Sequence, residues 1–265
     1  MKNNGISMRL IIMNFLQYAI WGAYLTSMGS YLAGIGMSAK IGIFYAMQGI
    51  VSIFMPAIVG IIADKYIPAQ KVLSICHGLA GLFMIAAGWY GMSAGENVAF
   101  GHLFGLYSLS VAFYMPTIAL SNSVAYSGLE RYGLDTVKDF PPIRVFGTVG
   151  FICSMLFVNF MTIDGVQFQH SYNQFFTSGI IGLALCAFAL TLPPCPVSKT
   201  NEGTSFVDVF GLRAFSLFKK KDMAIFFIFS MLLGVSLQIT NGFANPFITS
   251  FASIPEYADS WGAQN

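Results

Sequence analysis

Long apolar stretches, separated by short polar segments, form most of this chain. Each stretch has about 20 residues, the length that an α-helix needs to cross the hydrocarbon core of a bilayer. The stretches are continuously apolar, unlike the alternating strands of a membrane barrel, and a helix satisfies its own backbone hydrogen bonds in lipid. The pattern therefore predicts seven transmembrane helices, over residues 10–33, 41–63, 72–92, 98–121, 142–161, 172–192 and 223–247.

Composition supports an all-α polytopic membrane protein embedded in a lipid bilayer. The chain is 56% hydrophobic and 9% charged, and its mean hydropathy is +0.69. Average protein composition includes about 25% charged residues, so an ordinary soluble domain is excluded. The first apolar run is longer than the core of a signal peptide and lacks a clear cleavage site, so we expect it to remain as the first span.

Lys and Arg fall almost entirely on alternate polar segments. Only Lys40 lies in a predicted outer segment, and the outer segments around Glu96 and Asp164 contain neither Lys nor Arg. The positive-inside rule then predicts a cytoplasmic N-terminus, and an odd number of spans places the C-terminus outside. The net charge of +2 reflects this topology and indicates no nucleic-acid binding. The basic residues assigned to the inner side are Lys2, Arg9, Lys65, Lys71, Arg131, Lys138, Lys199, Arg213, Lys219, Lys220 and Lys221.

The connections between spans divide the chain unevenly. We predict an N-terminal six-helix bundle over 1–192, a cytoplasmic linker over 193–222, and a seventh transmembrane helix with an outer tail over 223–265. Six spans, a linker and one further span resemble an interrupted larger plan, so we expect a C-terminal half to be missing. A helix lying in the inner interface is one interpretation of the linker, and a basic anchor beside a span is the other. The apolar face behind this interpretation comprises Phe206, Phe210, Ala214, Leu217 and Phe218.

The cysteines and histidines indicate no metal site and no cofactor. Cys76, Cys153 and Cys186 fall within predicted spans and Cys195 at a cytoplasmic edge, and their spacing matches no metal-ligand pattern. We expect them to pack as small apolar residues. His77 is the one histidine well within a span, and a hydrogen-bonded packing histidine is the preferred interpretation, with a proton carrier as the alternative.

A permanent positive charge near the head of the fifth predicted span is the first candidate for function. Arg144 cannot lose its proton, so near lipid it must reach the interface, a polar cavity or an anionic partner. Thr148 and Phe151 follow at helical spacing, which places a cation, a hydroxyl and an aromatic ring on one helix face. The alternative is an anchoring arginine beside Pro141 and Pro142, which suit the beginning of a helix.

The seventh predicted span repeats this spacing with carboxamides, at Gln238, Asn241 and Asn245. An amide offers a donor and an acceptor side by side, which matches the edge of a nucleobase. Because amides facing lipid would be costly, we expect this face to line a cavity or a helix contact.

Several motifs resemble those of known transporters. Gly60-Ile-Ile-Ala-Asp64-Lys65, between the second and third spans, resembles the start of the major facilitator signature, a gating motif in which a glycine, an acid and a base link neighbouring helices. The usual basic tail is replaced here by Tyr66-Ile-Pro-Ala-Gln70. An ordinary tight loop with one ion pair is the alternative.

Further motifs extend this resemblance over nearly the whole chain. Together they closely resemble the bacterial nucleoside:proton symporters, a family of nucleoside permeases within the major facilitator superfamily. The motifs are Phe15-Leu-Gln17 with Trp21-Gly22, Ile75-Cys-His77, Tyr114-Met-Pro-Thr117, Asp139-Phe-Pro-Pro-Ile-Arg144, Gly147-Thr148, Ala224-Ile-Phe-Phe-Ile-Phe-Ser-Met-Leu-Leu-Gly234 and Leu237-Gln-Ile-Thr-Asn241.

This resemblance implies a major facilitator fold, with seven helices present of an expected twelve, in the bacterial cytoplasmic membrane. It implies a transporter that imports nucleosides together with protons by alternating access, and no enzyme activity. The family's substrate contacts carry over to Arg144, Thr148, Phe151, Gln238 and Asn241. We add three secondary cavity candidates from the residues themselves, which are Gln17, Tyr24 and Asn245.

The predicted spans contain no Asp or Glu. Proton coupling needs a group that changes charge, so we expect the coupling acid in the missing half, and we expect no coupled uptake by this chain alone. A major facilitator carrier for another polar solute, such as a sugar, is the alternative function. A seven-helix receptor is disfavoured by the predicted cytoplasmic N-terminus, and a membrane-embedded enzyme by the isolation of its candidate catalytic groups.

Overall fold

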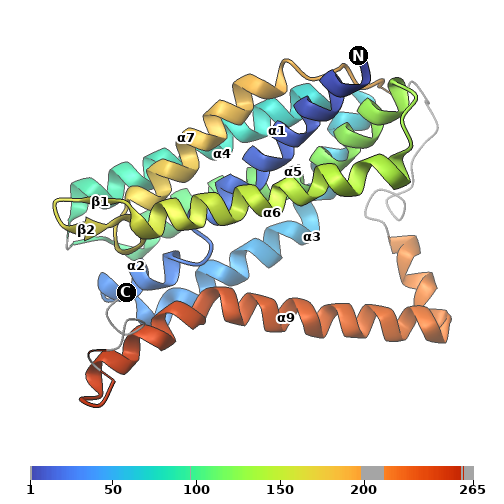
Figure 1. Cartoon of the computed structure of the whole chain (residues 1–265). Helices are drawn as coiled ribbons and strands as arrows, with labels where there is room; N and C mark the ends of the chain where they lie inside the picture. The colour runs from blue at the N-terminus through green and yellow to red at the C-terminus, as the bar shows by residue number, and fades with distance from the viewer. Residues whose placement is uncertain (1, 96, 198–211, 258, 260–265) are drawn as a thin grey trace.

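The computed structural model describes residues 2–95, 97–197, 212–257 and 259. These residues are almost entirely helical, which confirms the predicted all-α class (Figure 1). The α-helices are α1 (Lys2–Gly22), α2 (Met28–Gly34), α3 (Ile41–Lys65), α4 (Ala69–Ala94), α5 (Phe100–Arg131), α6 (Thr136–Phe160), α7 (Asn173–Ala189) and α9 (Lys221–Ser250). Short 3-10 helices are η1 (Ser38–Lys40), η2 (Phe168–His170), η3 (Leu212–Lys219) and η4 (Phe251–Ser253).

A small antiparallel hairpin, which the apolar pattern did not predict, follows α6. Its strands are β1 (Thr162–Ile163) and β2 (Val166–Gln167). Asp164 and Gly165 form the turn with positive φ angles of 51° and 78°. An Asp-Gly pair suits such a two-residue turn, so the local signal was present in the sequence.

The number of membrane spans differs from the prediction. Among the described residues, five helices are long and apolar enough to cross a membrane, and α7 is a shorter apolar helix. The first predicted span is broken into α1 and α2 by a turn over residues 23–27, where the amide of Tyr24 donates to the carbonyl of Trp21 only three residues back. The count of seven uninterrupted spans is therefore not confirmed. The five long helices are Ser38–Lys65, Ala69–Ala94, Phe100–Arg131, Thr136–Phe160 and Lys221–Ser253.

The helices α1 and α3 to α7 pack into one bundle (Figure 1). The helix α1 lies against α6 and α7, while α4 lies against α5 and α7, and α3 against α5. Glycines allow the closest of these approaches. A Cβ at Gly150 of α6 would clash with the carbonyl of Phe15 in α1, and a Cβ at Gly81 of α4 would lie 2.9 Å from the carbonyl oxygen of Gly179 in α7.

The last helix, α9, stands apart from this bundle. It contacts α2 and α3 close to its C-terminal end (Figure 1). No residue in its most apolar stretch is buried. At the contact, a Cβ at Gly29 of α2 would lie 2.5 Å from the carbonyl oxygen of Gly242 in α9. Most of α9 therefore presents an exposed apolar surface. A helix that packs against further transmembrane segments would have such a surface.

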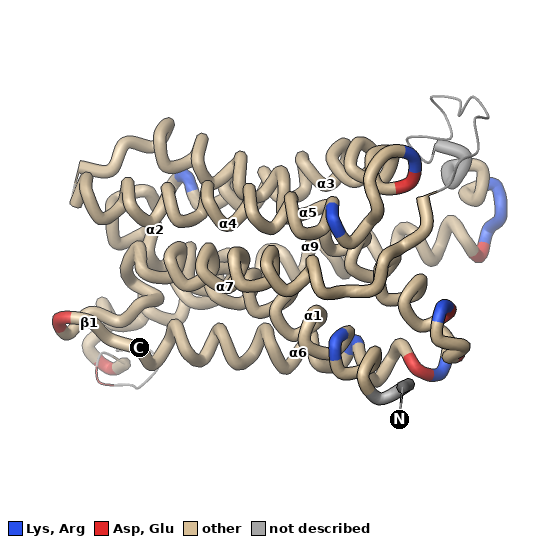
Figure 2. Tube along the Cα trace, turned by 90° about the horizontal axis from the view of Figure 1, so that it is seen from above, with Lys and Arg blue, Asp and Glu red and all other residues tan. Residues whose placement is uncertain are grey.

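Charge separates the two ends of the bundle. Figure 2 shows Lys and Arg gathered where α1 and α6 begin and where α3 and α5 end. Lys40 is the last residue of η1, directly before α3 begins, and so lies at the opposite end. We call the first the basic end, and the other, which carries β1 and β2, the hairpin end. The predicted linker face lies partly outside the described residues, because Phe206 and Phe210 are not described. Of the linker, η3 is a 3-10 helix.

Candidate functional site

The helix α6 begins earlier than the two prolines suggested. Asp135 is its N-cap, and its carboxylate accepts hydrogen bonds from the amides of Val137 (2.8 Å) and Lys138 (3.4 Å). Pro141 and Pro142 lie inside the helix. The predicted helix start at residue 142 was therefore wrong, because α6 begins at Thr136. At about 1.5 Å per residue, Arg144 lies roughly 12 Å along α6. It is therefore not at the mouth of its helix.

Arg144 is half-buried and contacts α1. Its guanidinium carbon lies 3.8 Å from the centroid of the Tyr18 ring, a cation–π geometry. Gly147 leaves room for this contact, since a Cβ there would lie 2.6 Å from the Tyr18 ring and 2.9 Å from Nη1 of Arg144. The Gly147-Thr148 motif thus has a steric reason at its first position.

Thr148 and Phe151 continue the same face. Thr148 is exposed, and Phe151 is partly buried. The Phe151 ring meets Trp21 of α1 edge-on, with centroids 6.5 Å apart and an interplanar angle of 89°. The structure therefore places the cation, the hydroxyl and the aromatic ring along α6, beside two aromatic residues of α1.

Trp21 is held in place by residues that were not among the predicted site residues. The indole Nε1–H of Trp21 donates to Oε1 of Gln48 at 3.2 Å, and Nε2 of Gln48 donates to the Tyr107 hydroxyl at 2.8 Å. The Trp21 ring also lies 6.4 Å from Tyr114. Gln48 gave a usable signal, because an amide within an apolar span needs a buried partner.

Two secondary candidates lie inside the bundle. Gln17 is fully buried, and its amide bonds Oγ1 of Thr117 (2.8 Å) and Nε2 of His77 (2.7 Å). Tyr24 is also fully buried, with its ring 6.0 Å from Tyr107. In this conformation neither side chain is on the open face of α6. His77 is fully buried and hydrogen-bonded, as the preferred interpretation of the sequence predicted.

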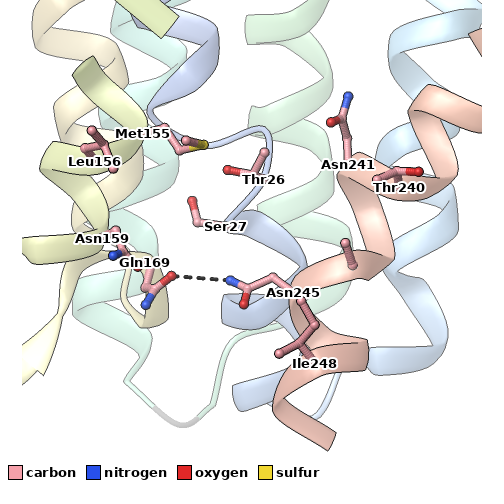
Figure 3. A pocket seen from close by; sticks show the side chains of 11 residues that line it. Thr26, Ser27, Met155, Leu156, Asn159, Gln169, Thr240, Asn241, Asn245 and Ile248 are labelled. Atoms are coloured by element: carbon pink, nitrogen blue, oxygen red, sulfur yellow. Dashed lines mark hydrogen bonds between the residues drawn. The ribbon is translucent and has the colours of Figure 1, made fainter. Parts of the chain in front are cut away.

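The amides of α9 lie nearer the hairpin end. Asn241 and Asn245 help to line a cavity of about 460 Å³, where Nδ2 of Asn245 donates to Oε1 of Gln169 at 3.3 Å (Figure 3). Gln238 is partly buried. From α6 the cavity takes residues beyond Phe151, so this cavity does not join the Arg144 face to the α9 amides. The lining residues are Thr26, Ser27, Met155, Leu156, Asn159, Gln169, Thr240, Asn241, Ala244, Asn245 and Ile248.

At the basic end, α3 finishes with the predicted gating motif. Asp64 is exposed, and a Cβ at Gly60 would meet no atom within 4 Å. The segment after α7 is hydrogen-bonded to α5 and α4 through Pro194 and Cys195. Nη1 of Arg131 donates to the carbonyl of Pro194 at 2.7 Å, and the amide of Cys195 donates to Oε1 of Gln70 at 2.9 Å.

The Cys195 side chain, in the segment after α7, is buried. Burial raises the pKa of Cys195, so its thiol is not activated as a nucleophile. This agrees with the packing role expected from the sequence.

A bundle of apolar helices in close glycine contact, with the long apolar helix α9 beside it, is the architecture of the major facilitator fold. The chain belongs to the Nucleoside H+ symporter family, whose model matches residues 4–261. It is 45% identical over 260 residues to the xanthosine permease of Escherichia coli, covering 97% of this chain and 59% of that relative. It is 42% identical over 264 residues to the nucleoside permease NupG of Escherichia coli, covering 98% of this chain and 60% of the relative.

A solved structure is similar along the same length. The crystal structure of the nucleoside transporter NupG, D323A mutant, matches with a TM-score of 0.84 and 41% sequence identity, over 98% of this chain and 62% of that chain. The chain thus spans about 60% of the length of the relatives it matches.

Proposed function

We propose that this chain supplies one half of the substrate path of a transporter that imports nucleosides together with protons. One observation carries the proposal: α6 of a nucleoside symporter family member presents Arg144, Thr148 and Phe151 along one face beside the α1 aromatic residues. The names of the similar proteins, a xanthosine permease and a nucleoside permease, support a nucleoside as the substrate.

The chemistry of this face suits a nucleoside. The rings of Phe151 and Trp21 offer aromatic surface for a base, and the exposed Thr148 hydroxyl can donate and accept one hydrogen bond. The Arg144 guanidinium, fixed over Tyr18, donates to oxygen atoms of the base or ribose. Gln238 and Asn241 of α9 supply amide donors and acceptors from the opposing half of the transporter.

Alternating access accounts for the position of α9. At the hairpin end, α9 touches the bundle through Gly29 and Gly242. The Tyr45 hydroxyl, which donates its hydrogen to the carbonyl of Leu25, lies 3.4 Å from the carbonyl oxygen of Asn241. Toward the basic end, α9 is exposed. We assign this arrangement to a conformation closed at the hairpin end and open at the basic end, which faces the cytoplasm by the positive-inside rule. In this proposal Gly60, Asp64 and Lys65 form part of the basic-end gate.

The proton-coupling acid is assigned to the part of the relatives beyond residue 265 of this chain. The apolar spans predicted for this chain contain no Asp or Glu. Arg144 cannot serve in its place, because a guanidinium does not lose its proton under physiological conditions.

Uptake of labelled uridine tests the proposal. The chain is expressed in cells that lack nucleoside carriers, by itself and fused to the remaining C-terminal part of the Escherichia coli nucleoside permease NupG, with and without a protonophore. We expect protonophore-sensitive uptake by the fusion and none by the chain alone. A fusion that inserts correctly and carries a sugar in place of uridine or adenosine would replace the substrate assignment and keep the fold.

A further inference from the structure

A small enclosed cavity lies within the bundle, away from the α6 face. Its walls come from α1, the turn after α1, α4, α5 and α7, and its volume is about 10 Å³. A cavity of about 10–15 Å³ is large enough for one water molecule, which needs two to four polar partners around it. The residues that line it are Ile20, Tyr24, His77, Ala80, Gly81, Met84, Ser110, Tyr114, Ser178 and Gly182.

Two polar atoms of the lining residues have no hydrogen-bond partner within the part of the chain that the structure describes. These are the hydroxyl of Tyr24 and Nδ1 of His77, and both side chains are fully buried. A buried polar group without a partner is destabilising, because it has lost its hydrogen bonds to water and gained none in return. Two such groups on one cavity of the right size therefore point to a shared ligand.

The surrounding hydrogen bonds decide which atom donates. The Thr117 hydroxyl donates its one hydrogen to the carbonyl of Tyr114 at 2.6 Å. It therefore accepts the hydrogen bond from Nε2 of Gln17 at 2.8 Å. This fixes the orientation of the Gln17 amide, with Oε1 facing His77. Because Oε1 only accepts, Nε2 of His77 carries the hydrogen and Nδ1 is left as an acceptor.

We propose that the cavity binds one water molecule, which accepts a hydrogen bond from the Tyr24 hydroxyl and donates one to Nδ1 of His77. Its second hydrogen is donated to a serine hydroxyl. Ser110 and Ser178 use their own hydrogens on the carbonyls of Ala80 (2.8 Å) and Ile20 (2.9 Å), which leaves their oxygen atoms free to accept. All polar groups of the cavity are then satisfied.

The bound water completes a chain of hydrogen bonds with one direction. It runs from Tyr24 through water, His77 and Gln17 to Thr117, and so ties α1 to α4 and α5. Gln17 lies on α1 next to Tyr18 and one turn before Trp21. We therefore assign His77 and its water as positioning groups that hold the α1 aromatic residues beside α6.

Nuclear magnetic resonance of the full chain with 15N-labelled histidine tests this inference on the unaltered protein. We expect His77 in the neutral Nε2–H form and a cross-peak between its ring protons and a long-lived water. An Nδ1–H form would overturn the assigned direction. An Nε2–H form without the water contact would overturn the water site and indicate a dry cavity.

Two matched variants sharpen the test. Tyr24→Phe removes the proposed donor, so we expect the His77 Nδ1 resonance to shift while the Nε2–H form is kept. Tyr31→Phe is the control, because the Tyr31 hydroxyl is also buried and unpartnered but does not line this cavity. Equal spectra for Tyr24→Phe and the unaltered protein would contradict the proposal. If Tyr24→Phe does not fold, the measurement on the unaltered protein still decides.

Discussion

The guanidinium carbon of Arg144 lies 3.8 Å from the centre of the Tyr18 ring, which joins the charged residue of α6 to α1. A lysine ammonium is a compact point charge, while the guanidinium is planar and presents several donors in a fixed fork. The contact therefore distinguishes Arg144 from an anchor for which any cation would serve.

Arg144→Lys is expected to lower nucleoside uptake by about 10- to 100-fold, since hydrogen bonds to charged groups contribute about 1.5–3 kcal/mol and about 1.4 kcal/mol corresponds to tenfold. The effect is measured as the initial rate of uridine uptake by the fusion with the C-terminal part of NupG, normalised to inserted protein. Lys138→Arg, two turns earlier on α6, is the control and is expected to retain uptake. Retained uptake in Arg144→Lys would favour the anchoring interpretation.

Gly147→Ala tests the same contact without changing a charge. The added Cβ would lie 2.6 Å from the Tyr18 ring and 2.9 Å from Nη1 of Arg144, so one of the two side chains has to move. We expect reduced uptake, with a larger loss for Gly147→Val. Gly105→Ala is the matched control on α5, because a Cβ at Gly105 meets no atom within 4 Å. Equal uptake by the two alanine variants would contradict a role for the Arg144–Tyr18 spacing.

These tests depend on a face of α6 that helical spacing predicts from the sequence. Arg144, Thr148 and Phe151 share one face because helical spacing alone places them there, and a single helix decides the outcome. The beginning of α6 was predicted wrongly, because the two prolines suggested a helix start while Asp135 supplied the actual N-cap.

The interior was harder to predict from the sequence. Gln17 was expected near the cavity, and its burial depends on Thr117 and His77, which lie 100 and 60 residues away along the chain. The packing of helices decides such contacts, and a periodic pattern within one helix carries no information about them. The break between α1 and α2 was also not predicted, because no proline marks it in the sequence.

Trp21 is expected to contribute to substrate affinity through its contact with Phe151. Stacking of a base on an aromatic ring contributes about 1–3 kcal/mol, so Trp21→Ala should weaken uridine binding by about 10-fold or more. Trp21→Phe keeps a ring but loses the bond to Gln48, and we expect an intermediate affinity. Binding to purified protein, measured by calorimetry, separates affinity from transport rate. Trp89→Ala, at an exposed position of α4, should bind like the unaltered protein.

The contact between Gly29 and Gly242 is expected to close the hairpin end. A Cβ at Gly242 would lie 3.1 Å from the Tyr45 ring, and a larger side chain would push α9 away from α2 and α3. In Gly242→Val we therefore expect the hairpin end to open more often. Labelling by a membrane-impermeant thiol reagent, added outside cells that express the fusion, measures this at Thr26→Cys, which lines the cavity beside α9.

Labelling of Thr26→Cys should be faster in the Gly242→Val background than in the background of Gly234→Val. Gly234 lies on the same helix, and a Cβ there meets no atom within 4 Å, so this control changes residue size without touching the contact. Added uridine should slow the labelling in both backgrounds if bound substrate favours closure at the hairpin end. Equal labelling rates in the two backgrounds would show that the glycine contact does not govern access, and the closure would then have to be assigned to the Asn245–Gln169 hydrogen bond.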